Sequence, residues 1–211
     1  VRYQDNPNFH IYYKFPNQKN TPNMFNETDE VVITRKIHGC NARYGIVKKL
    51  KLSIWDKIKI FFTGNKLLEY EYVYGSHNVE KGSDSQGFYA TDVRAEMAEK
   101  YNIKNKLWNV AKAIDINGLG SGFIIYGEIF GDGIQGEKYN YGLKDKQLRL
   151  FDIEIDNKYL CNDYFKAYCD NYLYIFQVEE LYKGLWSKEI QDFHVLNRFI
   201  DNTKIPHEGV V

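Results

Sequence analysis

The chain has 211 residues, of which 44% are hydrophobic and 27% charged, which is the balance of a folded domain with a substantial core. Lysine plus arginine and aspartate plus glutamate both number 28, so the net charge is zero and excludes a strongly basic nucleic-acid-binding footprint. Three cysteines without a Cys-x-x-Cys pair predict free thiols and a reducing, cytoplasmic-type compartment, and no apolar run is long enough to span a membrane.

The first third of the chain combines an irregular start with alternating elements. Residues 1–30 are rich in asparagine and proline, which predicts an irregular lead-in rather than a domain. The β-branched run 31–34 and the run 42–47 predict two strands, and the glycine turn between them favours a hairpin. Apolar residues at helical spacing predict a helix over 53–62, before a partly alternating strand over 67–74.

The rest of the chain mixes both element types. A polar loop is predicted over 82–87, helices over 92–101, 106–116, 162–168 and 186–193, a glycine-rich turn over 118–122, and strands over 123–130, 147–155 and 173–178. Because strands and helices do not alternate regularly, this order predicts an α+β fold with antiparallel sheets rather than a doubly wound sheet.

Several familiar motifs are absent or misleading. Gly131-x-Gly133-x-x-Gly136 has the spelling of a dinucleotide-binding fingerprint, but the residues after it do not open a helix, so a hairpin loop is predicted. No P-loop and no His/Cys spacing for structural zinc occur. Cys40 lacks the histidine and aspartate that would support a catalytic thiol.

The most informative stretch is residues 33–45. Lys36 ends a β-branched run, and Gly39, Asn41 and Arg43 follow it. A lysine that leaves a strand onto a tight glycine turn is expected to lie close to backbone and short of water, which suits a nucleophilic amine. Taken alone, the same residues also describe an ordinary lysine at a strand end beside a turn.

Three further motifs follow Lys36 in order. Tyr126-Gly127-Glu128 lies in an apolar run, Phe151-Asp152-Ile153-Glu154-Ile155 forms another, and Glu208-Gly209-Val210-Val211 closes the sequence. The series resembles the covalent nucleotidyltransferase superfamily, which contains ATP-dependent DNA and RNA ligases and mRNA capping enzymes. Within it, Lys-Ile-His-Gly-x-Asn most closely resembles the RNA ligase 2-like branch, where histidine is typical at the position of His38.

The resemblance implies a nucleotidyltransferase fold of the ATP-grasp-like ligase type, with two antiparallel sheets and flanking helices. The adenylyltransferase domain would cover residues 31–211. The family's final motif, a strand with two lysines, would lie beyond Val211, so this chain is expected to be truncated before it. A second domain that engages RNA, of OB or another type, is likewise expected to be absent from these residues.

The resemblance also assigns the nucleotide site. Lys36 would be the nucleophile that accepts AMP from ATP. The other positions are Arg35 and Ile37 beside the adenine, Asn41 and Arg43 beside the ribose and phosphates, Glu128 on the ribose hydroxyls, Phe151 stacked on the base, and Glu208 holding Mg²⁺ or Mn²⁺.

Each assignment has a plainer alternative. Glu128 also fits an exposed carboxylate at a sheet end, Phe151 fits a core aromatic, and Glu208 fits a lone carboxylate near a terminus. The family also carries an arginine in a Ser-Arg-Asn-like segment, where this chain has Ser76-His77-Asn78. The role of His77 in place of that arginine stays open.

The implied function is that of an ATP-dependent RNA ligase, which seals a 3′-hydroxyl to a 5′-phosphate through a lysyl-AMP intermediate. Its partners would be RNA ends or a nicked duplex, with the chain acting as a monomer. A DNA ligase and a capping guanylyltransferase are alternative enzymes. A non-catalytic nucleotide-binding relative is the third possibility, since the lysine motif is missing and His77 replaces the arginine.

Overall fold

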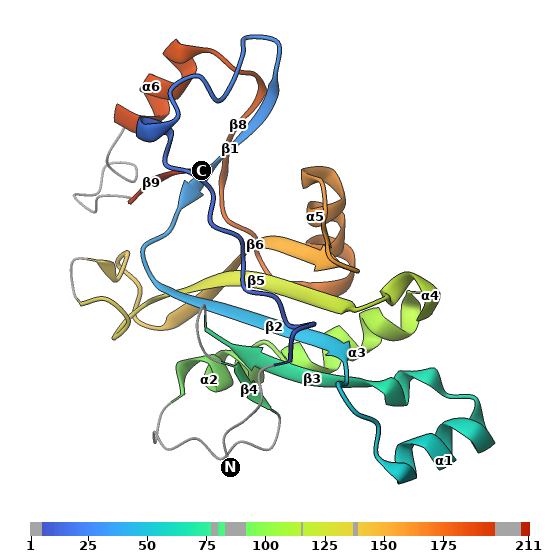
Figure 1. The fold of residues 1–211 in the computed structure, drawn as a ribbon. Helices are drawn as coiled ribbons and strands as arrows, with labels where there is room; N and C mark the ends of the chain where they lie inside the picture. The colour runs from blue at the N-terminus through green and yellow to red at the C-terminus, as the bar shows by residue number, and fades with distance from the viewer. Residues whose placement is uncertain (1–5, 77–79, 83–91, 115, 137–138, 197–207) are drawn as a thin grey trace.

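The structure is a computed structural model that describes residues 6–76, 80–82, 92–114, 116–136, 139–196 and 208–211 (Figure 1). Its strands form two sheets. The larger has six strands in the order β4-β3-β2-β5-β6-β7, and the smaller has three in the order β8-β1-β9. All strand pairs within both sheets are antiparallel, which confirms the predicted α+β class.

The elements have the following bounds. The larger sheet contains β2 (Cys40–Lys48), β3 (Tyr70–Gly75), β4 (Glu80–Gly82), β5 (Gly122–Gly131), β6 (Lys146–Ile155) and β7 (Lys158–Tyr159). The smaller contains β1 (Glu30–Lys36), β8 (Glu180–Leu185) and β9 (Gly209–Val210). The helices are α1 (Ile54–Thr63), α2 (Val93–Lys100), α3 (Ile103–Ala113), α4 (Ile116–Leu119), α5 (Asn162–Tyr168) and α6 (Lys188–Leu196). Short 3₁₀ turns lie at Gln18–Asn20 and Lys66–Glu69, and a π-helical turn lies at Cys169–Leu173.

The main core lies between one face of the larger sheet and helices α2 and α3. Alternate residues on β2 and β5, such as Tyr44 and Ile125, point to this face because side chains alternate along a strand. From α3, Ile103, Leu107 and Val110 meet them at the i, i+4 and i+7 spacing of one helical face. Figure 1 shows both helices behind the sheet.

The opposite face of the larger sheet is covered by the N-terminal segment, residues 6–15. Phe9 is buried there in a second apolar cluster with Val47, Val73, Ile124 and Tyr126. Side-chain hydrogen bonds hold the segment in place: Asn6 Nδ2 donates to Glu71 Oε1 at 2.9 Å, and His10 Nδ1 lies 2.5 Å from Glu154 Oε1. The segment is irregular, as the sequence indicates, yet it forms part of the core.

Two strand predictions are wrong. β1 and β2 do not form a hairpin, because they belong to different sheets and residues 37–39 carry the chain from one to the other. β1 pairs instead with β8 and β9 from the far end of the chain, so distant pairing overrides the local turn signal. Residues 173–178 are not a strand, since Gln177 makes an isolated bridge to Leu150 and β8 starts at Glu180.

Other local predictions are confirmed with shifted ends. α1 begins after Ser53, whose Oγ accepts the Asp56 N–H at 3.0 Å, a standard N-cap. The strand expected at 67 starts at Tyr70, after a 3₁₀ turn. The glycine motif near Gly133 lies in the β5–β6 hairpin loop, as predicted. Residues 83–87 of the expected polar loop lie outside the described residues.

The structure also bears on the cysteines and on the expectation about membrane spanning. Cys40, Cys161 and Cys169 are all free thiols. Within the described part of the chain, no helix combines the length and apolar character needed to cross a bilayer.

Candidate functional site

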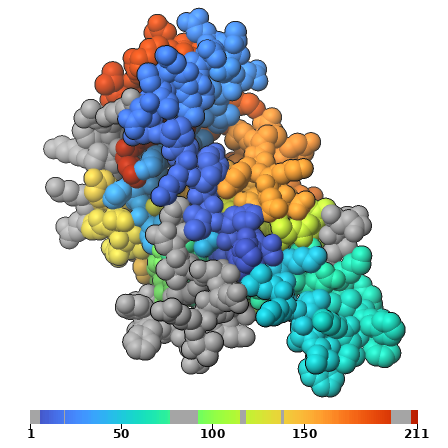
Figure 2. Space-filling model, in the orientation of Figure 1, coloured from blue at the N-terminus to red at the C-terminus, as the bar shows by residue number. Residues whose placement is uncertain are grey.

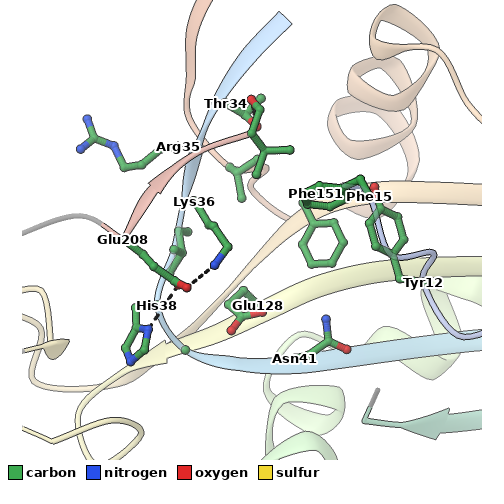
Figure 3. Close-up of a pocket in the computed structure, with 14 residues that line it drawn as sticks. Tyr12, Phe15, Thr34, Arg35, Lys36, His38, Asn41, Glu128, Phe151 and Glu208 are labelled. Carbon is green, nitrogen blue, oxygen red and sulfur yellow. Dashed lines mark hydrogen bonds and ion pairs between the residues drawn. The ribbon is translucent and has the colours of Figure 1, made fainter. Parts of the chain in front are cut away.

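A cavity of about 370 Å³ lies where the smaller sheet meets the larger one (Figure 3). Its walls come from β1, β2, β5, β6, the N-terminal segment and the last residues of the chain. The lining residues are Tyr12, Phe15, Thr34, Arg35, Lys36, Ile37, His38, Gly39, Asn41, Glu128, Phe151, Val178, Glu208 and Val211. The four motifs of the sequence, spread over more than 170 positions, therefore converge on one cavity.

The smaller sheet places Lys36 beside Glu208. In the β1–β9 pairing, Lys36 lies opposite Gly209 and Arg35 opposite Val210, so the residue before β9 reaches the end of β1. Lys36 Nζ forms an ion pair with Glu208 Oε1, and His38 Nδ1 lies 3.2 Å from Glu208 Oε2. Figure 3 shows Glu208 between the other two side chains. One carboxylate thus contacts both the lysine and the histidine of the Lys-Ile-His-Gly motif.

The expectation that Lys36 is short of water is wrong. Its side chain is 43% exposed and points into the open cavity. The reason is that β1 lies in a three-stranded sheet with little packing over this end, rather than in a hairpin on the larger sheet. A substrate that fills the cavity would be needed to exclude water from the amine.

Asn41 and Glu128 are neighbours on the larger sheet. They lie directly opposite each other in the β2–β5 pairing, so both side chains emerge on the cavity face. Burial, followed by repulsion from Glu208, raises the pKa of Glu128 to about 7, while Lys36, a hydrogen bond from the Gly39 backbone and Arg94 pull it down. The two polar side chains form a pair suited to hydroxyl groups of a ligand.

Aromatic rings form another wall. The rings of Tyr12 and Phe151 pack edge to face with centroids 5.0 Å apart, and Phe15 lines the cavity beside them. The Tyr12 hydroxyl donates to Asp152 Oδ2 at 2.8 Å, which fixes the tyrosine on β6. Burial raises the pKa of Asp152 to about 6, and the hydrogen bond from Tyr12 opposes that rise. The wall offers apolar ring surface to a planar ligand.

The turn after Lys36 is held against β5. A Cβ at Gly39 would lie 2.2 Å from the Ile129 carbonyl oxygen, so glycine is required for this close approach. The β5–β6 loop holds the other side: Gln135 Nε2 donates to the Gly39 carbonyl at 2.6 Å, and the Tyr141 hydroxyl accepts the His38 N–H at 2.8 Å. Tyr141 itself has a left-handed φ of 56°. These contacts define the path of the backbone between Lys36 and Asn41.

Arg43 does not line the cavity. It is 4% exposed and its guanidinium lies 4.1 Å above the Phe9 ring, while its Nε donates to the Ser76 carbonyl at 2.9 Å. It also donates to the Phe9 carbonyl. Arg43 points to the cavity face of β2 like Asn41, but the N-terminal segment covers it there. It anchors that segment, and the sequence did not indicate this cover.

Arg35 and Ile37 line the cavity beside Lys36. The Arg35 guanidinium points away from the cavity, because its Nε donates to Glu179 Oε2 at 2.7 Å (Figure 3). Its backbone is therefore the part that faces a ligand.

Several residues of the site were not predicted from the sequence, because they belong to none of the four motifs. Tyr12, Phe15 and Val178 line the cavity, and Arg94 of α2 donates from Nε to the Asn41 carbonyl at 3.0 Å and from Nη2 to Cys40 Sγ at 2.7 Å. Burial raises the pKa of the Cys40 thiol despite that arginine. His77 lies outside the described residues.

The carboxylates of the site are few. Among the described residues, no group of three or more histidine, cysteine, aspartate or glutamate side chains is placed to hold a metal ion. Glu128 and Glu208 do line the same cavity. Two carboxylates suit a hard cation such as Mg²⁺ or Mn²⁺ that takes its remaining ligands from water and substrate phosphates. The donor set therefore fits a metal that arrives with its ligand rather than a resident one.

Similar solved structures share this fold. A Naegleria gruberi RNA ligase with PPi superposes with a TM-score of 0.61 at 18% identity, covering 99% of this chain and 57% of that one. An apo mutant of that ligase gives 0.60 at 19% identity, covering 88% and 46%, and a mutant with AMP and Mn gives 0.58 at 18%, covering 87% and 46%. The chain thus spans about half the length of these proteins.

No curated protein matches the chain. A family model, however, does match its sequence. The family described as RNA ligase matches residues 29–211, which include Lys36, Asn41, Glu128, Phe151 and Glu208. Because the match covers most of the chain and the fold agrees, the chain belongs to the RNA ligase family.

Proposed function

We propose that this chain is the adenylyltransferase domain of an ATP-dependent RNA ligase. The observation that carries the proposal is the convergence of Lys36, Asn41, Glu128, Phe151 and Glu208 on one cavity. Membership of the RNA ligase family supports it. So do the solved structures of similar fold from Naegleria gruberi RNA ligase, which hold AMP or ATP together with Mn.

The reaction begins at Lys36. Its ammonium gives a proton to water and separates from Glu208, and the neutral Nζ attacks the α-phosphorus of ATP. A P–N bond forms, the bond between the α-phosphorus and the oxygen bridging to the β-phosphate breaks, and pyrophosphate leaves. The product is AMP joined to Lys36 as a phosphoramidate.

The other residues bind the nucleotide. The adenine lies on the aromatic wall, against Phe151, with Tyr12 and Phe15 at its edge. Asn41 and Glu128 hydrogen-bond the ribose hydroxyls, which their adjacent positions on β2 and β5 allow. A carboxylate with a pKa near 7 is present in both states at neutral pH, and its ionised form is the better acceptor.

Glu208 has two roles in this scheme. Before ATP binds, it pairs with Lys36 and His38 and keeps the amine oriented toward the cavity. When ATP arrives with Mg²⁺ or Mn²⁺, Glu208 would hold the metal together with phosphate oxygens and water. The metal supplies positive charge that offsets the charge developing on the phosphate oxygens.

The full-length protein would then transfer AMP to a 5′-phosphate of RNA and join that end to a 3′-hydroxyl, with release of AMP. Its substrates would be RNA ends or a nicked duplex, and the chain would act as a monomer in a reducing compartment. Residues 31–211 would form the adenylyltransferase unit, with residues 6–15 completing its nucleotide pocket.

The test is the intact mass of the purified chain before and after incubation with ATP and Mg²⁺, with the modified peptide mapped. We expect a gain of one AMP on Lys36, no gain in Lys36→Ala, and an unchanged gain in Lys112→Ala, where the lysine is exposed on α3. Transfer from GTP instead of ATP would favour a capping guanylyltransferase. Reversible nucleotide binding without any adduct, in this chain and in a version extended past Val211 to include the family's two-lysine strand, would favour a non-catalytic relative. An adduct on the extended version alone would assign the defect to the lysine strand.

A further inference from the structure

Helix α1 carries an apolar face that points to solvent. It projects from the end of β2 as a separate lobe, at the lower right of Figures 1 and 2. None of its residues is buried. Trp55, Phe61 and Phe62 are 73%, 84% and 79% exposed, and Ile54 is similarly exposed. A stable soluble domain rarely presents this many large apolar side chains together unless the surface binds something.

The orientation of α1 is fixed by its polar side. Asp56 forms an ion pair with Lys49 at 3.0 Å, and Asp56 and Ile60, one turn apart, are the less exposed residues of the helix. Gly64 ends the helix in a left-handed conformation, with its N–H bonded to the Ile60 carbonyl. Capping at both ends and this ion pair hold the helix with its aromatic face outward.

The same lobe holds a concentration of positive charge. Residues 48–66 contain six lysines against one aspartate, which gives the stretch a formal charge of +5. Because the whole chain is neutral, the remaining residues carry −5. Lys48 pairs with Glu69 at 3.5 Å and Lys49 with Asp56. Lys51, Lys57, Lys59 and Lys66 are exposed, and none of them has an acidic partner at ion-pair distance among the described residues.

We propose that α1 is an RNA-binding surface that contacts the substrate strand several nucleotides from the end being sealed. Exposed aromatic rings beside unpaired lysines form the combination that binds single-stranded nucleic acid, through base stacking and phosphate contacts. The charge complementarity to RNA decides the occupant, since residues 48–66 carry a formal charge of +5 in a chain whose net charge is zero. This inference rests on the proposed RNA-sealing function.

The position of α1 defines the distance between this surface and the cavity. The cavity lies at the start of β2, next to Asn41. Helix α1 follows the other end of the same strand, after Lys48 (Figure 1). At about 3.3 Å per residue, β2 separates the two by about 25 Å. A strand with its 5′-phosphate in the cavity would reach α1 about eight nucleotides from that end, at roughly 3 Å per nucleotide.

The experiment measures the affinity of the chain for fluorescent 5′-phosphorylated RNA of 20 nucleotides by anisotropy, without ATP. We expect the combined variant Trp55→Ala, Phe61→Ala, Phe62→Ala to bind at least about tenfold more weakly. Lys57→Glu with Lys59→Glu should weaken binding to a similar extent at low salt and lower the slope of affinity against salt concentration. RNA of four nucleotides, too short to contact the cavity and α1 together, should bind the parent more weakly than the 20-nucleotide RNA does.

Controls outside the lobe make the comparison specific. Tyr164→Ala removes an aromatic ring on α5 that is 67% exposed, and Lys112→Glu reverses an exposed lysine on α3, and both should bind RNA like the parent. Because the substituted α1 residues are exposed, thermal melting should be unchanged. Labelling of Lys36 by ATP is measured on the same proteins and should also be unchanged, since α1 lies at the other end of β2.

Three results would overturn the inference. One is unchanged affinity for the long RNA in both α1 variants, and another is a parent chain that binds no RNA. The third is loss in the variants of binding to phosphatidylserine vesicles, or of self-association, with RNA affinity intact, which would assign the surface to a membrane or a second copy. A parent chain that binds RNA through α1 but gains no AMP would count against the adenylyltransferase proposal alone.

Discussion

The two sheets of this molecule differ sharply in packing. The six-stranded sheet is covered on one face by α2 and α3 and on the other by the N-terminal segment, so β2 and β5 are buried along most of their length. In the described strands β1, β8 and β9, Ile33 alone is buried. The well-packed sheet carries Asn41, Glu128 and Phe151, whereas the thinly packed one carries Lys36.

This difference matches what each side of the pocket has to do. Groups that recognise a ligand by shape act best when packing fixes their positions. The lysine and Glu208 must separate during the reaction, and local motion costs least where few apolar contacts are lost. The larger sheet therefore holds the ligand-recognising groups and the smaller sheet the reacting lysine because the two sheets differ in burial.

The largest expected effect compares the stability of the two sheets. Ile125→Ala removes a fully buried side chain of β5 and should lower the free energy of unfolding by about 2–5 kcal/mol. Val31→Ala in β1 removes a partly exposed side chain and should cost less than about 1 kcal/mol. Urea unfolding of the two variants measures both values. Equal losses would show that the smaller sheet is as tightly packed as the larger.

The second prediction concerns how the free energy of unfolding changes with pH because of the buried carboxyl groups of Glu128 and Asp152. Burial raises the pKa of Glu128 from 4.5 to about 7, so the folded state holds its proton more tightly than the unfolded chain does. Stability from this group is complete below pH 4.5 and is lost as pH rises through 7, by up to about 3 kcal/mol. Asp152, with a pKa of about 6, contributes in the same direction at lower pH.

Urea unfolding at pH 5, 6, 7 and 8 tests the assignment to Glu128. Glu128→Gln should remove most of the decline between pH 6 and 8, while Glu99→Gln, at an exposed position of α2, should leave it as in the parent. A decline of equal size in all three proteins would assign the titration to another group.

The third prediction concerns the junction between the sheets. Gly39→Ala would place a Cβ 2.2 Å from the Ile129 carbonyl oxygen, so the turn must move and carry Lys36 with it. We expect labelling by ATP to fall by about 100-fold, because small displacements of a reacting group are costly. Gly118→Ala, whose Cβ would meet ordinary contact at 3.5 Å, is the matched control. Labelling at the parent rate would show that the turn does not position the lysine.

The smallest expected effect tests the loop that supports the same turn. Tyr141→Phe removes the acceptor of the His38 N–H and should slow labelling about fivefold and cost about 1 kcal/mol of stability. The apparent KM for ATP should stay near the parent value, since Tyr141 does not line the cavity. Tyr164→Phe, at an exposed hydroxyl on α5, should change none of these quantities. A change in KM without a change in rate would place Tyr141 in ATP binding instead.

The sequence alone determined the elements whose signals are local. The β-branched run before Lys36, the apolar runs around Glu128 and Phe151, and the helical spacing of apolar residues over 53–62 each act within a few residues, and the structure has the corresponding strands and helix. Through the family resemblance, the ordered motifs also predicted Lys36, Asn41, Glu128, Phe151 and Glu208 in the cavity, but they wrongly added Arg43.

Tertiary structure decided what depends on partners distant in the chain. β1 pairs with β8 and β9 rather than with β2, and the N-terminal segment covers Arg43 and brings Tyr12 and Phe15 to the pocket. The exposure of Lys36 follows from that pairing. These features depend on which surfaces bury each other, and a residue's own neighbours in sequence do not encode that choice.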